Sequence, residues 1–258
     1  MIRKALLFFI TVSLFCSCAS RKKIVYFQNI SNTSEGSAVN YEPSLKADDL
    51  LLIIVSASDP ESVKDFNLPI VGVMNSSVSN MSVISGQNQF QTYLVDNNGN
   101  IQFPVLGTLK LGGLTRAEAL SKLNTELKKY VSDAIVNMRI LNFKVSLLGE
   151  VLRAGSYNIN TERVSLPEAL AMAGDMTIYG DRSRVLIIRE ANGKKTHNFV
   201  DMTKADFINS PFYYLTQNDV VYVEPNKTRI NSSVIGPNIT VAISGISLLI
   251  TIIALATR

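Results

Sequence analysis

The sequence predicts an α+β protein: two small mixed-sheet αβ units followed by one C-terminal transmembrane helix. The two units are indicated because short apolar, strand-like runs alternate twice with a helical pattern, and each helix begins at a capping box. The terminal helix is indicated by residues 239–256, which carry no charged side chain. Such a run would form about 27 Å of helix, enough to cross a thin hydrocarbon layer.

The start of the chain has the layout of a secretory signal peptide, with a basic start before an apolar run over residues 5–15. That run is too short to span a membrane. It ends in two cysteines separated by a serine, which resembles the bacterial lipobox, where cleavage before a cysteine leaves that residue lipidated. We assign the lipid anchor to Cys18, because small Ser17 precedes it. Cys16 follows bulky Phe15 instead, and an ordinary signal peptide is the alternative.

Composition excludes several classes of protein. Both cysteines lie at the cleavage site, so no disulfide stabilises the exported part. The formal charge of +4 falls to +2 when Arg3 and Lys4 are removed, which is too small to indicate nucleic-acid binding.

The basic run 21–23 follows the lipid site and is expected to contact anionic headgroups. Residues 29–40 are polar and turn-rich, which predicts a flexible tether.

The first unit is predicted to begin with a strand and a long insertion. Residues 50–55 form a continuous apolar run of strand length. Residues 57–92 are predicted to be a loop insertion, because their later part is rich in Ser, Asn and Gln and has no helical period. The runs 93–95 and 101–104 are then expected as strands around a tight hairpin turn, in which Gly99 supplies the positive φ.

The first unit is predicted to end with a helix and a strand. Thr115 is followed three residues later by Glu118, which is the spacing of a capping box. Apolar residues recur at helical spacing from there to residue 130. An apolar run over residues 134–141 predicts the closing strand.

The second unit repeats this pattern of strands around one helix. Ser165 and Glu168 form another capping box, and Gly174 is placed to end the short helix that follows. The predicted strands of this unit cover residues 144–151, 155–159, 185–188, 195–200 and 220–223. Their order predicts a small mixed sheet crossed by one helix.

In this order, the motifs resemble the outer-membrane polysaccharide export family, the Wza-type capsule and exopolysaccharide translocons. The first unit is similar to the family's export domain in residues 45–55, 95–107, 113–119 and 130. The second unit resembles the soluble-ligand-binding β-grasp (SLBB) domain in residues 145–155, 167–174 and 218–223. One SLBB-like unit is visible where longer members carry two, so the resemblance implies a shorter periplasmic part.

The resemblance and the patterns together divide the chain into five parts. The predicted parts are a lipoprotein signal peptide (1–17), a lipidated N-terminus with a flexible tether (18–40), an export domain with its loop insertion (41–143), an SLBB β-grasp domain (144–226) and a C-terminal transmembrane helix (227–258).

The resemblance implies a non-enzymatic lipoprotein subunit of an oligomeric outer-membrane translocon that exports capsular polysaccharide or exopolysaccharide. It further implies a homo-oligomeric ring, an octamer, and an inner-membrane polysaccharide co-polymerase as partner. The domains would be periplasmic and the C-terminus extracellular. No cofactor is expected beyond the covalent lipid, a palmitate, on Cys18, and no nucleic-acid partner. An anchored periplasmic ligand- or glycan-binding β-grasp module without a pore is the alternative, and an exported hydrolase is a third hypothesis.

Four small hydroxyl side chains form one stripe of the predicted terminal helix: Thr240, Ser244, Ser247 and Thr251. Such a stripe lines the water of a helical barrel, lets helices pack closely, or belongs to a plain anchor. The sequence leaves these three hypotheses open.

No catalytic or metal site is predicted. His197 is the only histidine, and no thiol remains after cleavage, so the residues for a zinc site are missing. Neither a nucleophile elbow nor a phosphate-binding glycine loop is present in the sequence.

Overall fold

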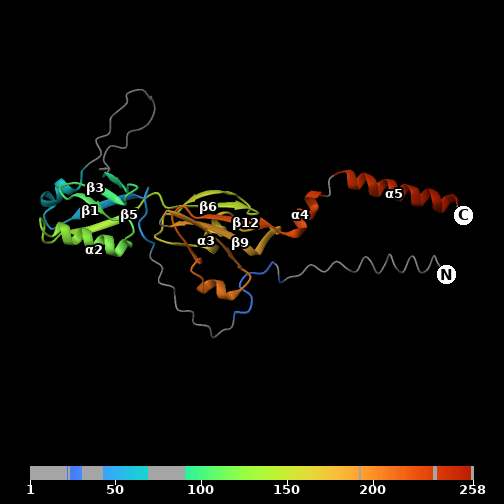
Figure 1. Ribbon diagram of the computed structural model, residues 1–258, viewed down its shortest axis with the longest axis horizontal. Coiled ribbons are helices and arrows are strands. Elements are labelled where there is room, and N and C mark those ends of the chain that lie inside the picture. Colours follow the sequence, from blue (N-terminus) through green and yellow to red (C-terminus); the bar gives the residue numbers. More distant parts are fainter. Residues whose placement is uncertain are drawn as a thin grey trace, which may run out of the picture.

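The computed structural model describes residues 22, 24–30, 43–68, 91–191, 193–234 and 237–256. Two αβ units lie side by side, and helix α5 extends from the far side of the second unit (Figure 1). The predicted α+β class is confirmed. Cys18, the insertion residues 69–90 and most of the predicted tether lie outside the described residues.

The first unit is built on a three-stranded sheet in the order β2-β1-β5, against which α2 packs. The elements are β1 (Leu50–Ser56), β2 (Thr92–Leu94), β5 (Ile135–Ile140) and α2 (Arg116–Leu127). Leu51, Ile53 and Val55 alternate along β1 and are buried, as expected for a strand with one face on the core. Both pairings in this sheet are antiparallel, so the mixed sheet predicted for this unit is wrong. A parallel pair of strands needs a crossover connection, usually a helix. Helix α2 is not such a crossover, because the strands before and after it belong to different sheets.

The predicted hairpin lies one strand later than expected. Gly99 has the expected positive φ of +80°. Its carbonyl, however, accepts from the N–H groups of Leu111 (2.9 Å) and Gly112 (2.8 Å). A Cβ at Gly112 would lie 2.5 Å from the Cα of Gly99, so the turn packs against the later backbone. Consequently β2 pairs with β1, while β3 (Asn100–Phe103) pairs with β4 (Gly107–Lys110).

The described start of the insertion contains η2 (Pro60–Phe66), a 3-10 helix that buries Val63 and Phe66. Asn67 ends it and binds the backbone of Val55. The Asn67 amide donates to the Val55 carbonyl at 2.6 Å, and its oxygen accepts from the Val55 N–H at 2.9 Å. The start of the insertion is therefore part of the first core.

Helix α2 begins at the predicted capping box. The Thr115 hydroxyl accepts from the Glu118 N–H at 3.3 Å, and the Glu118 carboxylate accepts from the Thr115 N–H at 2.8 Å. These contacts satisfy two of the donors that a helix start leaves free.

The second unit has a five-stranded mixed sheet in the order β10-β9-β12-β6-β7, in which only the β12–β6 pair is parallel. The strands are β6 (Lys144–Gly149), β7 (Gly155–Asn158), β9 (Gly180–Ala191), β10 (Lys194–Val200) and β12 (Val220–Pro225). Helix α3 (Leu166–Met172) begins at the predicted Ser165–Glu168 capping box. Two further strands, β8 (Val164–Ser165) and β11 (Tyr214–Leu215), pair with each other, and η3 (Ala205–Asn209) lies between β10 and β11. The mixed sheet predicted for this unit is confirmed.

Residues 26–28, which precede the predicted tether, lie against the second unit (Figure 1). The Phe27 N–H donates to the Met202 carbonyl at 3.1 Å, and the Phe27 ring stacks on Phe207 at 6.5 Å between centroids. The Tyr26 hydroxyl donates to Asp175 Oδ1 at 2.5 Å. Burial raises the pKa of this hydroxyl.

Two helices follow β12, namely α4 (Lys227–Val234) and α5 (Pro237–Ala256). The transmembrane segment predicted over 227–258 thus corresponds to two helices, of which α5 contains 20 residues. In the described ranges, no helix reaches the combined length and hydropathy of a membrane span.

Candidate functional site

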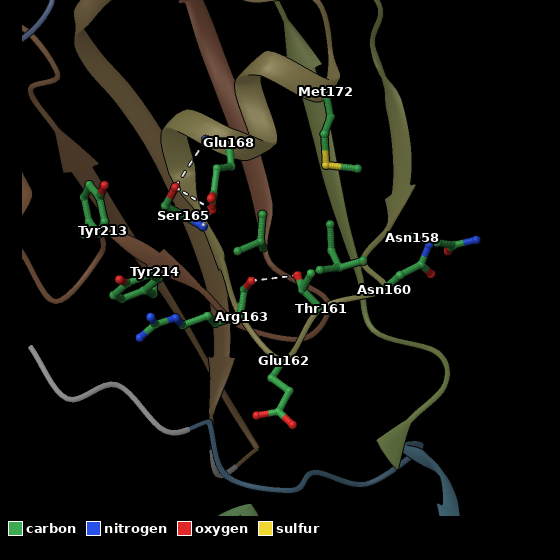
Figure 2. Close-up of a pocket in the computed structure, with 12 residues that line it drawn as sticks. Asn158, Asn160, Thr161, Glu162, Arg163, Ser165, Glu168, Met172, Tyr213 and Tyr214 are labelled. Carbon is green, nitrogen blue, oxygen red and sulfur yellow. Dashed lines mark hydrogen bonds between the residues drawn. The ribbon is translucent and has the colours of Figure 1, made fainter.

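A groove of about 610 Å³ lies in the second unit, between α3 and the loop that joins β7 to β8 (Figure 2). It is open to solvent and lies within the size range of sites that bind small molecules. Most of the residues that line it have polar side chains, and the full set is Asn158, Ile159, Asn160, Thr161, Glu162, Arg163, Val164, Ser165, Glu168, Met172, Tyr213 and Tyr214.

The loop between β7 and β8 forms one wall of the groove. Buried Ile159 and Val164 anchor its two ends in the core, and the exposed residues between them carry the polar groups. The Thr161 hydroxyl donates to the Arg163 carbonyl at 2.8 Å, which closes the loop on itself. The fold therefore holds a short polar loop in a fixed place beside α3.

Both carboxylates at the groove are already engaged. Glu168 Oε2 accepts from the backbone N–H of Ser165 at 2.7 Å and from its hydroxyl at 2.8 Å, which caps α3. Glu162 forms an ion pair of 3.1 Å with Arg116 at the start of α2 in the first unit. The groove wall is thus tied to the neighbouring unit.

Two tyrosines form the opposite edge of the groove (Figure 2). The rings of Tyr213 and Tyr214 meet edge to face, at 5.0 Å between centroids and an interplanar angle of 84°. The guanidinium carbon of Arg163 lies 5.1 Å from the centroid of the Tyr214 ring, within cation–π distance. Strand β11 holds Tyr214 through its pairing with Ser165 of β8.

This arrangement suits reversible binding. Amides, hydroxyls, one arginine and aromatic rings converge on an open groove, and such groups orient a polar ligand without reacting with it. In the part of the chain that the structure describes, no three His, Cys, Asp or Glu side chains lie together as a metal site.

A second polar cluster joins the two units. The Lys46 ammonium of the first unit donates to three oxygens of the second unit: the carbonyls of Glu190 at 3.0 Å and Gln217 at 3.4 Å and the hydroxyl of Thr216 at 3.1 Å. Burial lowers the pKa of this ammonium. The Gln217 amide also donates to the Asn142 carbonyl at 2.7 Å, in the segment that connects the units.

A buried ion pair supports this junction from the second unit. Arg189 Nη2 lies 2.7 Å from Asp219 Oδ2, and the Asp219 side chain is fully buried. Asp219 also accepts from the N–H and the hydroxyl of Thr216, each at 2.8 Å. The Asp219 carboxylate therefore holds Thr216 in place, and the Thr216 hydroxyl in turn accepts from Lys46.

The sequence-predicted site residues do not lie in the groove. Cys18 is outside the described residues. Ser244, Ser247 and Thr251 lie on α5 and are exposed, and the Thr251 hydroxyl donates to the Ser247 carbonyl at 2.8 Å. The backbone of Thr240 belongs to the same helix.

No sequence pattern predicts the groove itself. One signal is present in the sequence: a run of polar residues, 160–163, stands between a strand and a capping box. The tyrosine pair at 213–214 is about fifty residues away, and only the β8–β11 pairing brings it alongside.

The fold and the groove define a two-unit α+β protein with a polar binding groove and a terminal helix. Residues 37–141 match the family described as "Polysaccharide biosynthesis/export protein". The predicted resemblance to the polysaccharide export protein family is therefore confirmed for this part of the chain. The match covers the first unit.

Two curated relatives support this assignment, the proteins named "EPS I polysaccharide export outer membrane protein EpsA" of Ralstonia solanacearum and Ralstonia nicotianae. Each is 28% identical over 195 residues, which cover 73% of this chain and 50% of the relative. The chain therefore spans about half the length of these relatives.

Proposed function

We propose that this protein is an outer-membrane lipoprotein subunit of an oligomeric translocon that exports capsular polysaccharide or exopolysaccharide. The match of residues 37–141 to the polysaccharide export family carries the proposal, together with similarity to relatives named as export proteins of the outer membrane. The role is non-enzymatic: the groove offers binding groups, and the carboxylates at it are engaged in a helix cap and an ion pair.

The positions of the two chain ends support an anchored arrangement. Residues 26–28 lie on the second unit, and a lipid on Cys18 would be at most about 29 Å from Tyr26 along an extended chain. Helices α4 and α5 leave the same unit after β12. In this arrangement the second unit lies beside the outer membrane. The first unit lies further into the periplasm, towards an inner-membrane co-polymerase.

Helix α5 provides the surface for assembly. Its exposed apolar side chains include Val241, Ile243, Leu248, Leu249 and Leu255, each more than half exposed. An isolated helix with this surface would be a liability in water, so lipid or neighbouring copies must cover it. We assign α5 to the outer membrane, where the helices of a homo-oligomeric ring, an octamer, pack together. The C-terminus would then be extracellular.

Deletion of the gene in its host tests the proposal. The strain should lose surface polysaccharide and regain it when the wild-type gene is restored. Cys18→Ser should abolish labelling by a fatty-acid analogue and reduce export, and Cys16→Ser is the matched control that should do neither. Unchanged surface polysaccharide in the deletion strain would refute the export role.

The alternative is an anchored ligand-binding module without a pore, which the groove in the second unit favours. The size of the detergent-extracted particle separates the two. A ring of several copies is expected for the translocon, and a monomer or dimer for the binding module.

A further inference from the structure

We propose that the groove beside α3 binds a short stretch of the exported polysaccharide, in contact with Arg163 and Tyr214. The inference rests on the proposed function, because it takes the exported polymer as its ligand. It assigns to the second unit a direct contact with the substrate, at residues that lie outside the segment matched by the family.

The shape of the groove suits a polymer. Its volume of about 610 Å³ exceeds what one amino-acid side chain would fill, and it is open to solvent. An open groove can hold part of a longer chain, whereas an enclosed cavity would accept only a free, small ligand.

Uncommitted hydrogen-bonding groups line the groove. Among the described residues, the side-chain amides of Asn158 and Asn160 have no hydrogen-bond partner. An amide donates and accepts at the same time, which matches the hydroxyl groups of a sugar, since each of these also does both. A phosphate only accepts hydrogen bonds, so it would use the N–H donors of the amides and leave their carbonyl oxygens without a donor.

One cationic group at the groove also lacks a carboxylate partner. In the described part of the chain, Arg163 has no ion pair, whereas Glu162 is paired with Arg116. Stacking over Tyr214 holds the guanidinium in place and leaves its N–H groups available to sugar hydroxyls or a sugar carboxylate. Tyr214 itself also lines the groove, and the apolar atoms of an aromatic ring suit the C–H groups of a sugar.

The expected affinity is weak, which suits transport. Because exposed hydrogen bonds each contribute little, a few of them give a dissociation constant on the order of 1 mM. A chain held this weakly is oriented and then released. The ion pair of Glu162 with Arg116 also brings the groove loop into contact with the first unit.

The test uses the full chain extracted in detergent. The probe is a set of short oligosaccharides prepared by partial hydrolysis of the host's own surface polysaccharide, and saturation-transfer NMR measures their binding. Arg163→Ala and Tyr214→Leu should each weaken binding about five- to tenfold. If Tyr214→Leu does not fold, Asn160→Ala in the exposed loop replaces it and should weaken binding about fivefold.

The second unit offers a matched control pair away from the groove. Arg184 lies 4.0 Å from the ring centroid of Phe199, so Arg184→Ala and Phe199→Leu remove a similar contact on β9 and β10. Both should bind the oligosaccharides as the wild type does. Equal losses in the control and groove variants would overturn the assignment.

Three further results would also overturn the groove assignment: no binding by the wild type, unchanged binding by both groove variants, or equal binding of dextran oligomers of the same length.

The export assay separates this inference from the proposed function. If the deletion blocks export while the groove variants bind normally, only the groove assignment fails. If the deletion leaves export intact, the proposed function itself fails.

Discussion

At the scale of single residues, Asp49 is the most unfavourably placed charge in the first unit. Its side chain is 1% exposed. Oδ2 accepts from the Lys46 N–H at 2.8 Å, while Oδ1 has no partner in the described part of the chain. Burial raises the pKa of this carboxyl to about 6, well above its usual value of 3.8. Compared with the unfolded chain, the folded protein therefore holds this proton up to a higher pH.

The direction of the pH dependence follows from this raised pKa. Protonated Asp49 contributes stability below about pH 4, and the contribution is lost as the pH rises through about 6. Asp49→Asn removes the buried charge, keeps an acceptor for the Lys46 N–H, and should increase the free energy of unfolding at pH 8 by on the order of 1–3 kcal/mol. Little change is expected at pH 4.

Denaturation of the full chain at the two pH values measures this effect. Asp48→Asn is the matched control, because Asp48 is the exposed neighbour and loses the same charge. A gain of equal size in both variants at pH 8 would show that burial of Asp49 is not the cause.

At the scale of elements, the junction depends on Lys46. Lys46→Met removes all three hydrogen bonds from its ammonium to the second unit, of which those to Thr216 and Gln217 are partly buried. The loss should cost about 1–3 kcal/mol, expressed as loosening between the units and not as unfolding of either one. Hydrogen exchange of residues 142–146 should then become faster.

Lys122→Met provides the control for this variant, because the Lys122 ammonium also donates to a carbonyl, that of Lys110 at 2.9 Å, but within the first unit. It should leave exchange at residues 142–146 unchanged. If Lys46→Met also leaves that exchange unchanged, the packing of Ile140 against both cores holds the units together without the lysine.

The same scale shows what could be predicted from the sequence. Both capping boxes mark helix starts correctly, because a cap is local and needs only residues three positions apart. Strand pairing is not local. The contacts of Gly99 with Leu111 and Gly112 move the hairpin to β3 and β4, although the turn residue itself is predicted correctly.

Strands β8 and β11 contain two residues each, too few for any period to reveal them. Their pairing places Tyr214 beside Ser165, so the groove depends on a contact that no sequence pattern predicts. The polar loop of the groove is visible in the sequence, but its aromatic edge is not.

At the scale of the whole molecule, the hydroxyl stripe of α5 decides between the hypotheses for assembly. Ser244 and Ser247 are exposed on this helix, next to large apolar residues that are exposed as well. If the stripe lines a water-filled lumen, Ser244→Leu combined with Ser247→Leu adds bulk where the polymer slides. Export should then fall severalfold while the particle keeps its size, because the added leucines lie away from the helix contacts.

Close packing of α5 between copies gives a different result. Small residues let helices approach each other, so two leucines there should dissociate the particle, and export should be lost together with it. A plain anchor gives a third result, in which export and particle size both stay normal.

The control changes Ile246 and Ile250 to leucine outside the stripe, which keeps the apolar volume of the helix and should alter neither quantity. Surface polysaccharide and particle size must be measured in the same strains, because only the pair of values separates the three cases. Normal values of both in the stripe variant would remove the lumen, and the groove would then remain as the one candidate contact with the polymer.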